Sequence, residues 1–236
     1  MIRYMETRGG TWRAGAIAIC DKLKAAGVKK RQIVWIDAHN NDNDGAAIFS
    51  AFWDDNIKSD EPLEIAFEEQ NENYPWNQFY RNAAYKISTL RPESIISMTG
   101  SCNCHGRTVF FVFYYNNALT VERQDIHYTE ARGDTWEKAA QRIISNLHNE
   151  GAKRGQIIGI DAHNNKPNGD AIFSAFWNSS LQPLGDLTLQ HRLKIDKDSW
   201  NDHYQWAVRV TWYLDVHSIT SSCNIKGNGV TYVFHT

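Results

Sequence analysis

The sequence predicts an α+β protein that is a tandem duplication of one β-α-β-β-β-α-β-β unit with mostly antiparallel sheets. The first observation is that residues 32–53 recur as residues 156–177, 124 positions further on, with 16 of 22 positions identical. The second is that the predicted strands outnumber the helices and are joined by tight turns, which favours hairpins over parallel crossovers. We therefore expect two halves related by a pseudo-two-fold axis, as the protomers of a homodimer are.

The repeat divides the 236 residues into 1–118 and 119–236, with the joint near 116–124. Each half is long enough to bury a core of its own. The content of 42% hydrophobic and 22% charged residues is typical of a soluble globular protein. The net charge of −2, without any basic run, argues against nucleic acid as a partner. The longest apolar run, residues 109–115, is too short to span a bilayer.

Each half begins with an expected strand, at 2–9 and 126–133, because polar and apolar residues alternate there up to a glycine. A helix should follow, with Thr11 and either Asp134 or Thr135 as N-caps. Gly27 and Gly151 should end these helices. The apolar positions at helical spacing are Trp12, Ala16, Ile19 and Leu23 in the first copy and Trp136, Ala140, Ile143 and Leu147 in the second.

The repeated stretch itself is expected to be a β-hairpin. In its first strand Asp37 and His39 should share one face, with Val34, Ile36 and Ala38 on the other. The turn is rich in Asn, Asp and Gly in both copies, which are residues that tolerate a positive φ. The return strand is apolar on both faces, so we expect it to lie in the middle of a sheet.

The remaining elements of each half are a strand, a second helix and a closing hairpin. The strand is expected at 63–68 and again at 187–193. The second helix should place Trp76, Phe79, Tyr80, Ala83, Ala84 and Ile87 on one face, with Trp200, His203, Tyr204, Ala207 and Val208 as their counterparts. The last strands are expected at 109–114 and 230–234.

The residues best suited to bind a ligand follow the first strand of the hairpin in both copies. A carboxylate, an imidazole and two amides on one short arc can hold hydroxyl groups, and tryptophans at the end of the return strand can stack on rings. The competing interpretation is structural, because sharp turns need Asp and Asn, and a histidine can satisfy a backbone carbonyl. The predicted ligand-binding residues are Asp37, His39, Asn40, Asn41 and Trp53 with Asp161, His163, Asn164, Asn165 and Trp177.

The four cysteines predict neither a disulfide framework nor a metal site. Only Cys102 and Cys223 occupy matching places, and each alternates in phase with apolar neighbours, which is typical of a small core residue. Paired with His39 or His163, a reactive cysteine would instead suit a hydrolase. No zinc spacing, calcium loop or phosphate-binding glycine loop occurs, so we expect no cofactor and no metal.

These observations favour a non-enzymatic binding protein with one ligand site per repeat, for which a lectin-like carbohydrate site is the preferred interpretation. The first alternative is a structural, self-associating or defence protein without a small ligand. The second is a Cys/His-dependent hydrolase. The expected partner is a glycan or another small molecule, and a homo-oligomer remains open. The cysteine usage fits the cytoplasm, with a secreted mature form as the alternative.

Overall fold

The computed structural model describes residues 1–40, 47–72, 76–102, 108–116, 124–165, 170–211, 214–223 and 229–236. These residues form four α-helices and twelve strands, which confirms a mixed α+β protein. The first half contains β1 (Ile2–Gly9), α1 (Trp12–Ala25), β2 (Ile33–Asn40), β3 (Ala47–Asp54), β4 (Ile65–Glu72), α2 (Trp76–Ile87), β5 (Ile95–Cys102) and β6 (Thr108–Tyr115). The second contains β7 (Ile126–Gly133), α3 (Trp136–Asn149), β8 (Ile157–Asn165), β9 (Asp170–Asn178), β10 (Gln190–Asp196), α4 (Trp200–Thr211), β11 (Val216–Cys223) and β12 (Gly229–His235).

The strands form four antiparallel sheets of three strands each, in the orders β1-β3-β2, β4-β6-β5, β7-β9-β8 and β10-β12-β11. Every sheet follows the same path along the chain: an outer strand, a helix, an inner strand and then the middle strand. The return strand of the repeated hairpin is β3 in the first half and β9 in the second. Both occupy the middle of their sheets, as predicted.

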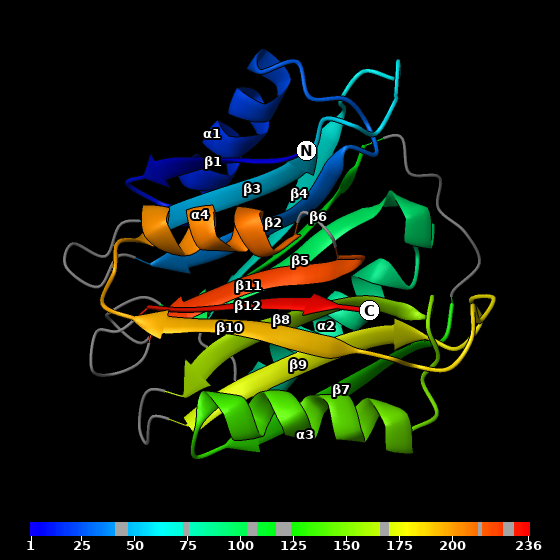
Figure 1. Ribbon diagram of the computed structural model, residues 1–236. Helices are drawn as coiled ribbons and strands as arrows, with labels where there is room; N and C mark the ends of the chain where they lie inside the picture. Colours follow the sequence, from blue (N-terminus) through cyan, green and yellow to red (C-terminus); the bar gives the residue numbers. More distant parts are fainter. Residues whose placement is uncertain are drawn as a thin grey trace.

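Each helix packs between two successive sheets, so the four sheets and four helices close into a ring (Figure 1). Helix α1 lies between the first and second sheets, and α3 lies between the third and fourth. Helix α2 joins the second sheet to the third, and α4 joins the fourth back to the first. Two of the four hydrophobic clusters therefore contain residues from both halves of the chain.

The middle strands are apolar on both faces because each face belongs to a different cluster. On β3, Phe49 packs in the cluster around α1, whereas Phe52 packs in the cluster around α4. On β6, Phe111 faces α1 and its neighbour Phe110 faces α2. Since side chains alternate across a strand, one continuous apolar run supplies two separate cores.

The ends of α1 and α3 follow the sequence prediction. The hydroxyl of Thr11 accepts a hydrogen bond from the N–H of Ala14 (3.1 Å), and Thr135 caps α3 in the same way. After α1, Gly27 adopts a φ of +73° and the N–H of Val28 donates to the carbonyl of Leu23 (3.1 Å). This is the glycine-ended cap in which the chain leaves the helix through a left-handed residue.

Two strand predictions need correction. The strands expected at 63–68 and 187–193 lie a few residues later, at β4 and β10, because Pro62 and Pro183 are followed by further irregular residues. In β2 the pairing register shifts between Ile33 and Trp35. Because of this bulge, the side chains that precede it point to the opposite faces of the sheet from those that simple alternation predicts. Val34 consequently packs in the cluster around α4, opposite to the expected face, whereas Ile36 and Ala38 lie as predicted.

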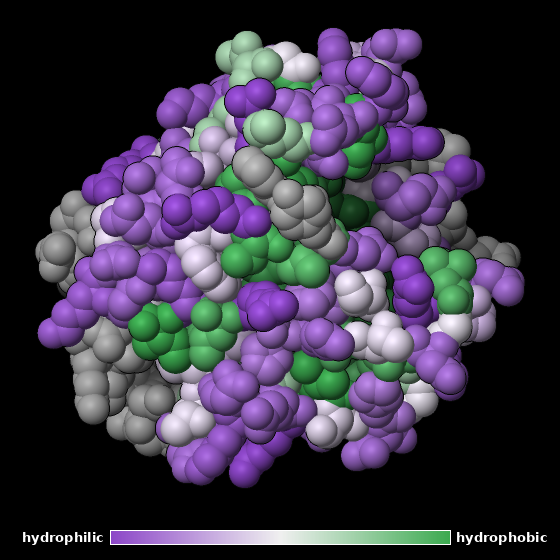
Figure 2. Space-filling model, viewed as in Figure 1, coloured by the Kyte–Doolittle hydropathy of each residue, from purple (hydrophilic) through white to green (hydrophobic). Residues whose placement is uncertain are grey.

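The molecular surface is largely polar on the face drawn in Figure 2, where apolar side chains form small separated areas among charged ones. The outer strands β1, β4, β7 and β10 carry charged side chains, which discourage pairing with another sheet edge. Among the described residues, no helix is long and apolar enough to cross a membrane.

Candidate functional site

The inner strands β2, β5, β8 and β11 gather at the centre of the ring, each beside the next, with β11 again beside β2. They belong to four different sheets, so no backbone ladder joins them. Side-chain oxygens instead satisfy their facing N–H groups. The N–H of Ala38 on β2 donates to the hydroxyl of Thr99 on β5 (2.9 Å), and the N–H of Ala162 on β8 donates to Thr220 on β11 (2.9 Å).

The structure brings four of the predicted ligand-binding residues together at this centre. Asp37 and His39 lie on β2, and Asp161 and His163 lie on β8. Asp37 is 0% exposed and the other three are 1% exposed, so all four are sealed from solvent. Their burial differs from the open, ligand-facing arc that the sequence suggested.

The two aspartates hold the inner strands together. The carboxylate of Asp37 accepts a hydrogen bond from Thr99 (3.3 Å). Asp161 accepts one from the backbone N–H of Gly100 (3.1 Å) and one from Thr220 (3.4 Å). Through these bonds β2 is tied to β5, while β8 is tied to both β5 and β11.

Each histidine is held by a tyrosine from a helix in the opposite half of the chain. The hydroxyl of Tyr204 on α4 lies 2.8 Å from Nδ1 of His39, and the hydroxyl of Tyr80 on α2 lies 2.7 Å from Nδ1 of His163. The sequence prediction placed both tyrosines only on an apolar helix face. The two tyrosines are 124 residues apart, and each places a hydroxyl on an apolar helix face. That repetition could have indicated a buried hydrogen-bond partner for each.

Burial shifts the protonation equilibria of Asp37, Asp161 and His163 towards the neutral side chains. It raises the pKa of Asp37 and Asp161, and for Asp161 the nearby carboxylate of Asp37 raises the pKa further. Burial lowers the pKa of His163 to about 3, so its imidazole is neutral at physiological pH. Perturbed groups of this kind are typical of functional sites, although buried structural networks also contain them.

Of the other predicted residues, the structure describes the side chains of Trp53 and Trp177 alone. Asn40 ends β2 and Asn165 ends β8, with Asn164 just before it; the side chains of these three and the whole of Asn41 lie outside the described residues. Trp53 and Trp177 lie on the middle strands β3 and β9, where they pack against the clusters around α1 and α3.

Trp177 is engaged on one face by another side chain. Its ring is 6% exposed and stacks on the imidazole of His127, with ring centroids 4.1 Å apart. Its indole N–H donates to the hydroxyl of Thr129 (3.4 Å). A ring held in this way offers little surface for stacking on a ligand.

Cys102 ends β5 and Cys223 ends β11, and their side chains also fall outside the described residues. Within the described part of the chain, no group of three or more His, Cys, Asp or Glu side chains is arranged to hold a metal ion. No protein-family model matches the sequence, and no curated protein matches it.

Proposed function

We propose that the protein is a non-enzymatic binding protein with one ligand site per half, at the end of the ring where β2 and β8 stop. Figure 1 shows β2, β8 and β11 pointing towards the same side of the molecule. The N–H of Ile160 bonds to Ser218 and the N–H of Ala162 bonds to Thr220, so both strands advance by two residues in the same direction. Strands β8 and β11 are therefore parallel. The matching positions Asn40 and Asn164 therefore follow the two buried Asp-His pairs along β2 and β8 towards this side of the molecule.

The observation that carries this proposal is that the buried pairs stand directly behind these strand ends. Asp37 and His39 are fixed by Thr99 and Tyr204, so the strand that leads to Asn40 is rigid. A preorganised polar rim loses little conformational entropy on binding. Amide groups that both donate and accept hydrogen bonds suit the hydroxyl groups of a carbohydrate, which is the ligand class we propose.

The test is glycan-array binding of the intact chain beside a variant that carries both Asn40→Ala and Asn164→Ala. The expected result is binding by the parent and loss in the variant, with an unchanged circular-dichroism spectrum. Asn56→Ala is the matched control, because Asn56 is exposed in the loop after β3 and should not affect binding. Binding that survives in the double variant would reject these strand ends as the sites.

A structural or self-associating protein is the second candidate, and the burial of the Asp-His pairs favours it. If the pairs serve only to fix the ring, no glycan binds to the parent. Substitution of Asp161 then lowers the free energy of unfolding without changing any ligand response. Sedimentation of the parent over a range of concentrations would detect the self-association.

We further infer that the two halves are tandem copies related by a pseudo-two-fold axis. The recurrence of residues 32–53 supports this, as does the pairing of contacts across the centre, where Tyr80 meets His163 and Tyr204 meets His39. A cytoplasmic location is proposed on the cysteine usage alone.

A further inference from the structure

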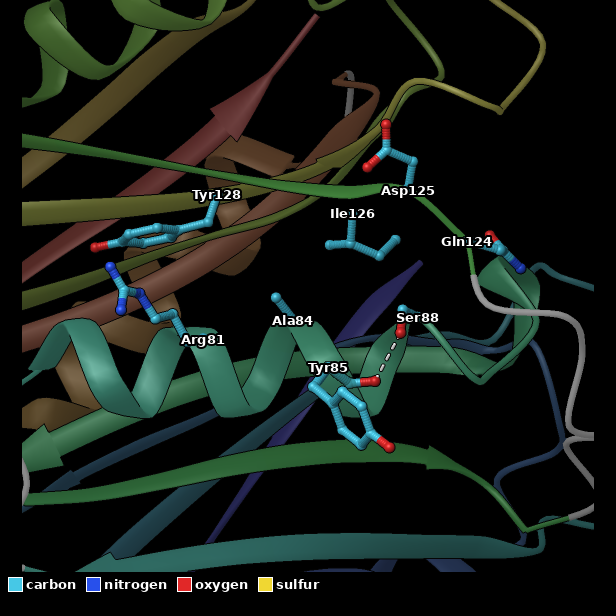
Figure 3. Close-up of a pocket in the computed structure, with 8 residues that line it drawn as sticks. All are labelled: Arg81, Ala84, Tyr85, Ser88, Gln124, Asp125, Ile126 and Tyr128. Carbon is cyan, nitrogen blue, oxygen red and sulfur yellow. Dashed lines mark hydrogen bonds between the residues drawn. The ribbon is translucent and has the colours of Figure 1, made fainter.

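A groove of about 550 Å³ lies between α2 and the segment that leads into β7 (Figure 3). Small-molecule sites commonly have volumes of roughly 300–1,000 Å³. Arg81, Ala84 and Tyr85 line it from α2, and Ile126 and Tyr128 line it from β7. The proposed function does not use any of these side chains.

The floor of the groove is apolar and one of its walls is a fixed aromatic ring. Ala84 and Ile126 are partly buried against the cluster around α2. Tyr128 stacks on the buried ring of Tyr80, with centroids 5.0 Å apart, and its hydroxyl donates to Glu130 (2.7 Å). The Tyr128 side chain is therefore held in place before any ligand arrives.

The end of the groove near Gln124 is equally rigid. The N–H of Gln124 donates to the carbonyl of Ser88 (2.9 Å), and its side-chain amide donates to the carbonyl of Leu90 (3.2 Å). The hydroxyl of Ser88 donates to the carbonyl of Tyr85 (2.8 Å), which is the bond drawn in Figure 3. The two bonds of Gln124 tie the two sides of the groove together, so its shape is largely preformed.

Arg81 supplies a positive charge at the other end of the groove. Its exposed side chain points from α2 towards Tyr128 in Figure 3. Among the described residues, no carboxylate lies within ion-pair distance of Arg81. Glu130 is paired with Arg132 (2.6 Å), and Asp125, which also lines the groove, lies 3.3 Å from the imidazole of His127. A guanidinium beside an apolar floor suits a ligand carboxylate, which it can bind through two parallel hydrogen bonds.

We propose that this groove binds a small carboxylate that carries a ring, with the carboxylate on Arg81 and the ring against the apolar floor of Ala84 and Ile126. The ring of Tyr85 points away from Ile126 and Tyr128 in Figure 3, so the ring of the ligand rests on the floor and not on Tyr85. Two kinds of molecule share this chemistry: an acidic sugar, such as a uronic acid, and an aromatic acid.

The corresponding place in the second half does not reproduce the groove. Positions 124 residues further along α4 carry Gln205 in place of Arg81 and Arg209 in place of Tyr85. The hydroxyl of Tyr4, the counterpart of Tyr128, is bonded to the side chain of Asn201. The site is therefore expected once per chain. Since glutamine already occupies the matching helical position, Arg81→Gln should leave the fold intact.

The test is a titration of the full chain, followed by the amide chemical shifts of the ¹⁵N-labelled protein. The probes are two matched pairs, glucuronate with glucose and phenylacetate with phenylacetamide, so that each pair differs in its negative charge. The parent is compared with Arg81→Gln, with Tyr85→Ala and with the control Arg209→Gln, an exposed arginine on α4.

The expected result is that at least one acid shifts the amides of residues 81–88 and 124–128 and that its neutral partner does not. The acid that binds identifies the ligand as a sugar acid or an aromatic acid. Arg81→Gln should weaken that binding by about tenfold or more, because a charge-assisted hydrogen bond is lost. Tyr85→Ala should change it little, and Arg209→Gln should not change it. The proposal is overturned if neither acid binds at millimolar concentration, or if Arg81→Gln binds as tightly as the parent.

Discussion

At the scale of single residues, Trp35 and Gly159 explain why the repeat is broken at one of its most central positions. They occupy matching places on β2 and β8, yet one is the largest side chain and the other has none. A Cβ atom on Gly159 would lie 2.5 Å from Cη2 of Trp35, which is far inside van der Waals contact. The two positions therefore meet at the centre of the ring, and the space there admits one indole ring only.

We expect Gly159→Ala to lower the free energy of unfolding by about 1–3 kcal/mol, since an added methyl group must displace the fully buried indole of Trp35. Urea denaturation gives the measurement. Gly10→Ala is the control, because a Cβ there meets nothing within 4 Å. In a Trp35→Leu background, Gly159→Ala should lower the free energy of unfolding by less than it does in the parent. Equal stability of Gly159→Ala and the parent would contradict this account of the centre.

At the scale of elements, local sequence patterns predicted the helices and the middle strands well. Each is determined by residues close together in the chain, as with the cap of Thr11 and the apolar run of β3. A further signal was missed: a tryptophan begins every helix, at Trp12, Trp76, Trp136 and Trp200. Each of these helices connects the outer strand of a three-stranded sheet to its inner strand, so the four tryptophans mark the four sheets of identical strand order.

The inner strands show what local patterns could not predict. Asp37 and His39 alternate correctly on β2, but the sequence cannot say whether that face meets solvent or another sheet. The answer depends on Thr99 and Tyr204, which lie 62 and 165 residues away. Polar residues in a strand are compatible with a ligand site and with a buried network alike, and here Asp37 and Asp161 accept hydrogen bonds from neighbouring sheets.

We expect Thr220→Val to destabilise the protein by about 1–3 kcal/mol, because the N–H of Ala162 loses its acceptor and Asp161 loses a donor in a buried place. Thr220→Ser keeps the hydroxyl and should cost less, which separates the hydrogen bond from the lost methyl group. Chemical denaturation compares the two. If both variants lose the same stability, the hydroxyl does not hold β8 to β11.

At the scale of the whole molecule, the ring arrangement makes the two halves depend on each other. The clusters around α1 and α3 lie within single halves, but those around α2 and α4 contain side chains from both. Residues 1–118 alone would expose the apolar faces that α4 and the third sheet cover. The boundary at 118/119 that the sequence predicts remains a prediction, and the shared clusters suggest how to test it.

We expect residues 1–118 and 119–236, expressed separately, to unfold at lower urea concentration than the intact chain, because two of the three clusters to which each half contributes lose the residues of the other half. Co-expression should restore a one-to-one complex, since the lost surfaces are complementary and Tyr80 and Tyr204 regain their histidines. Size-exclusion chromatography with light scattering measures the stoichiometry, and near-ultraviolet circular dichroism reports the packing of the tryptophans. If either half alone is monomeric and as stable as the full chain, each half has a self-sufficient core. The ring would then be an association of two independent domains.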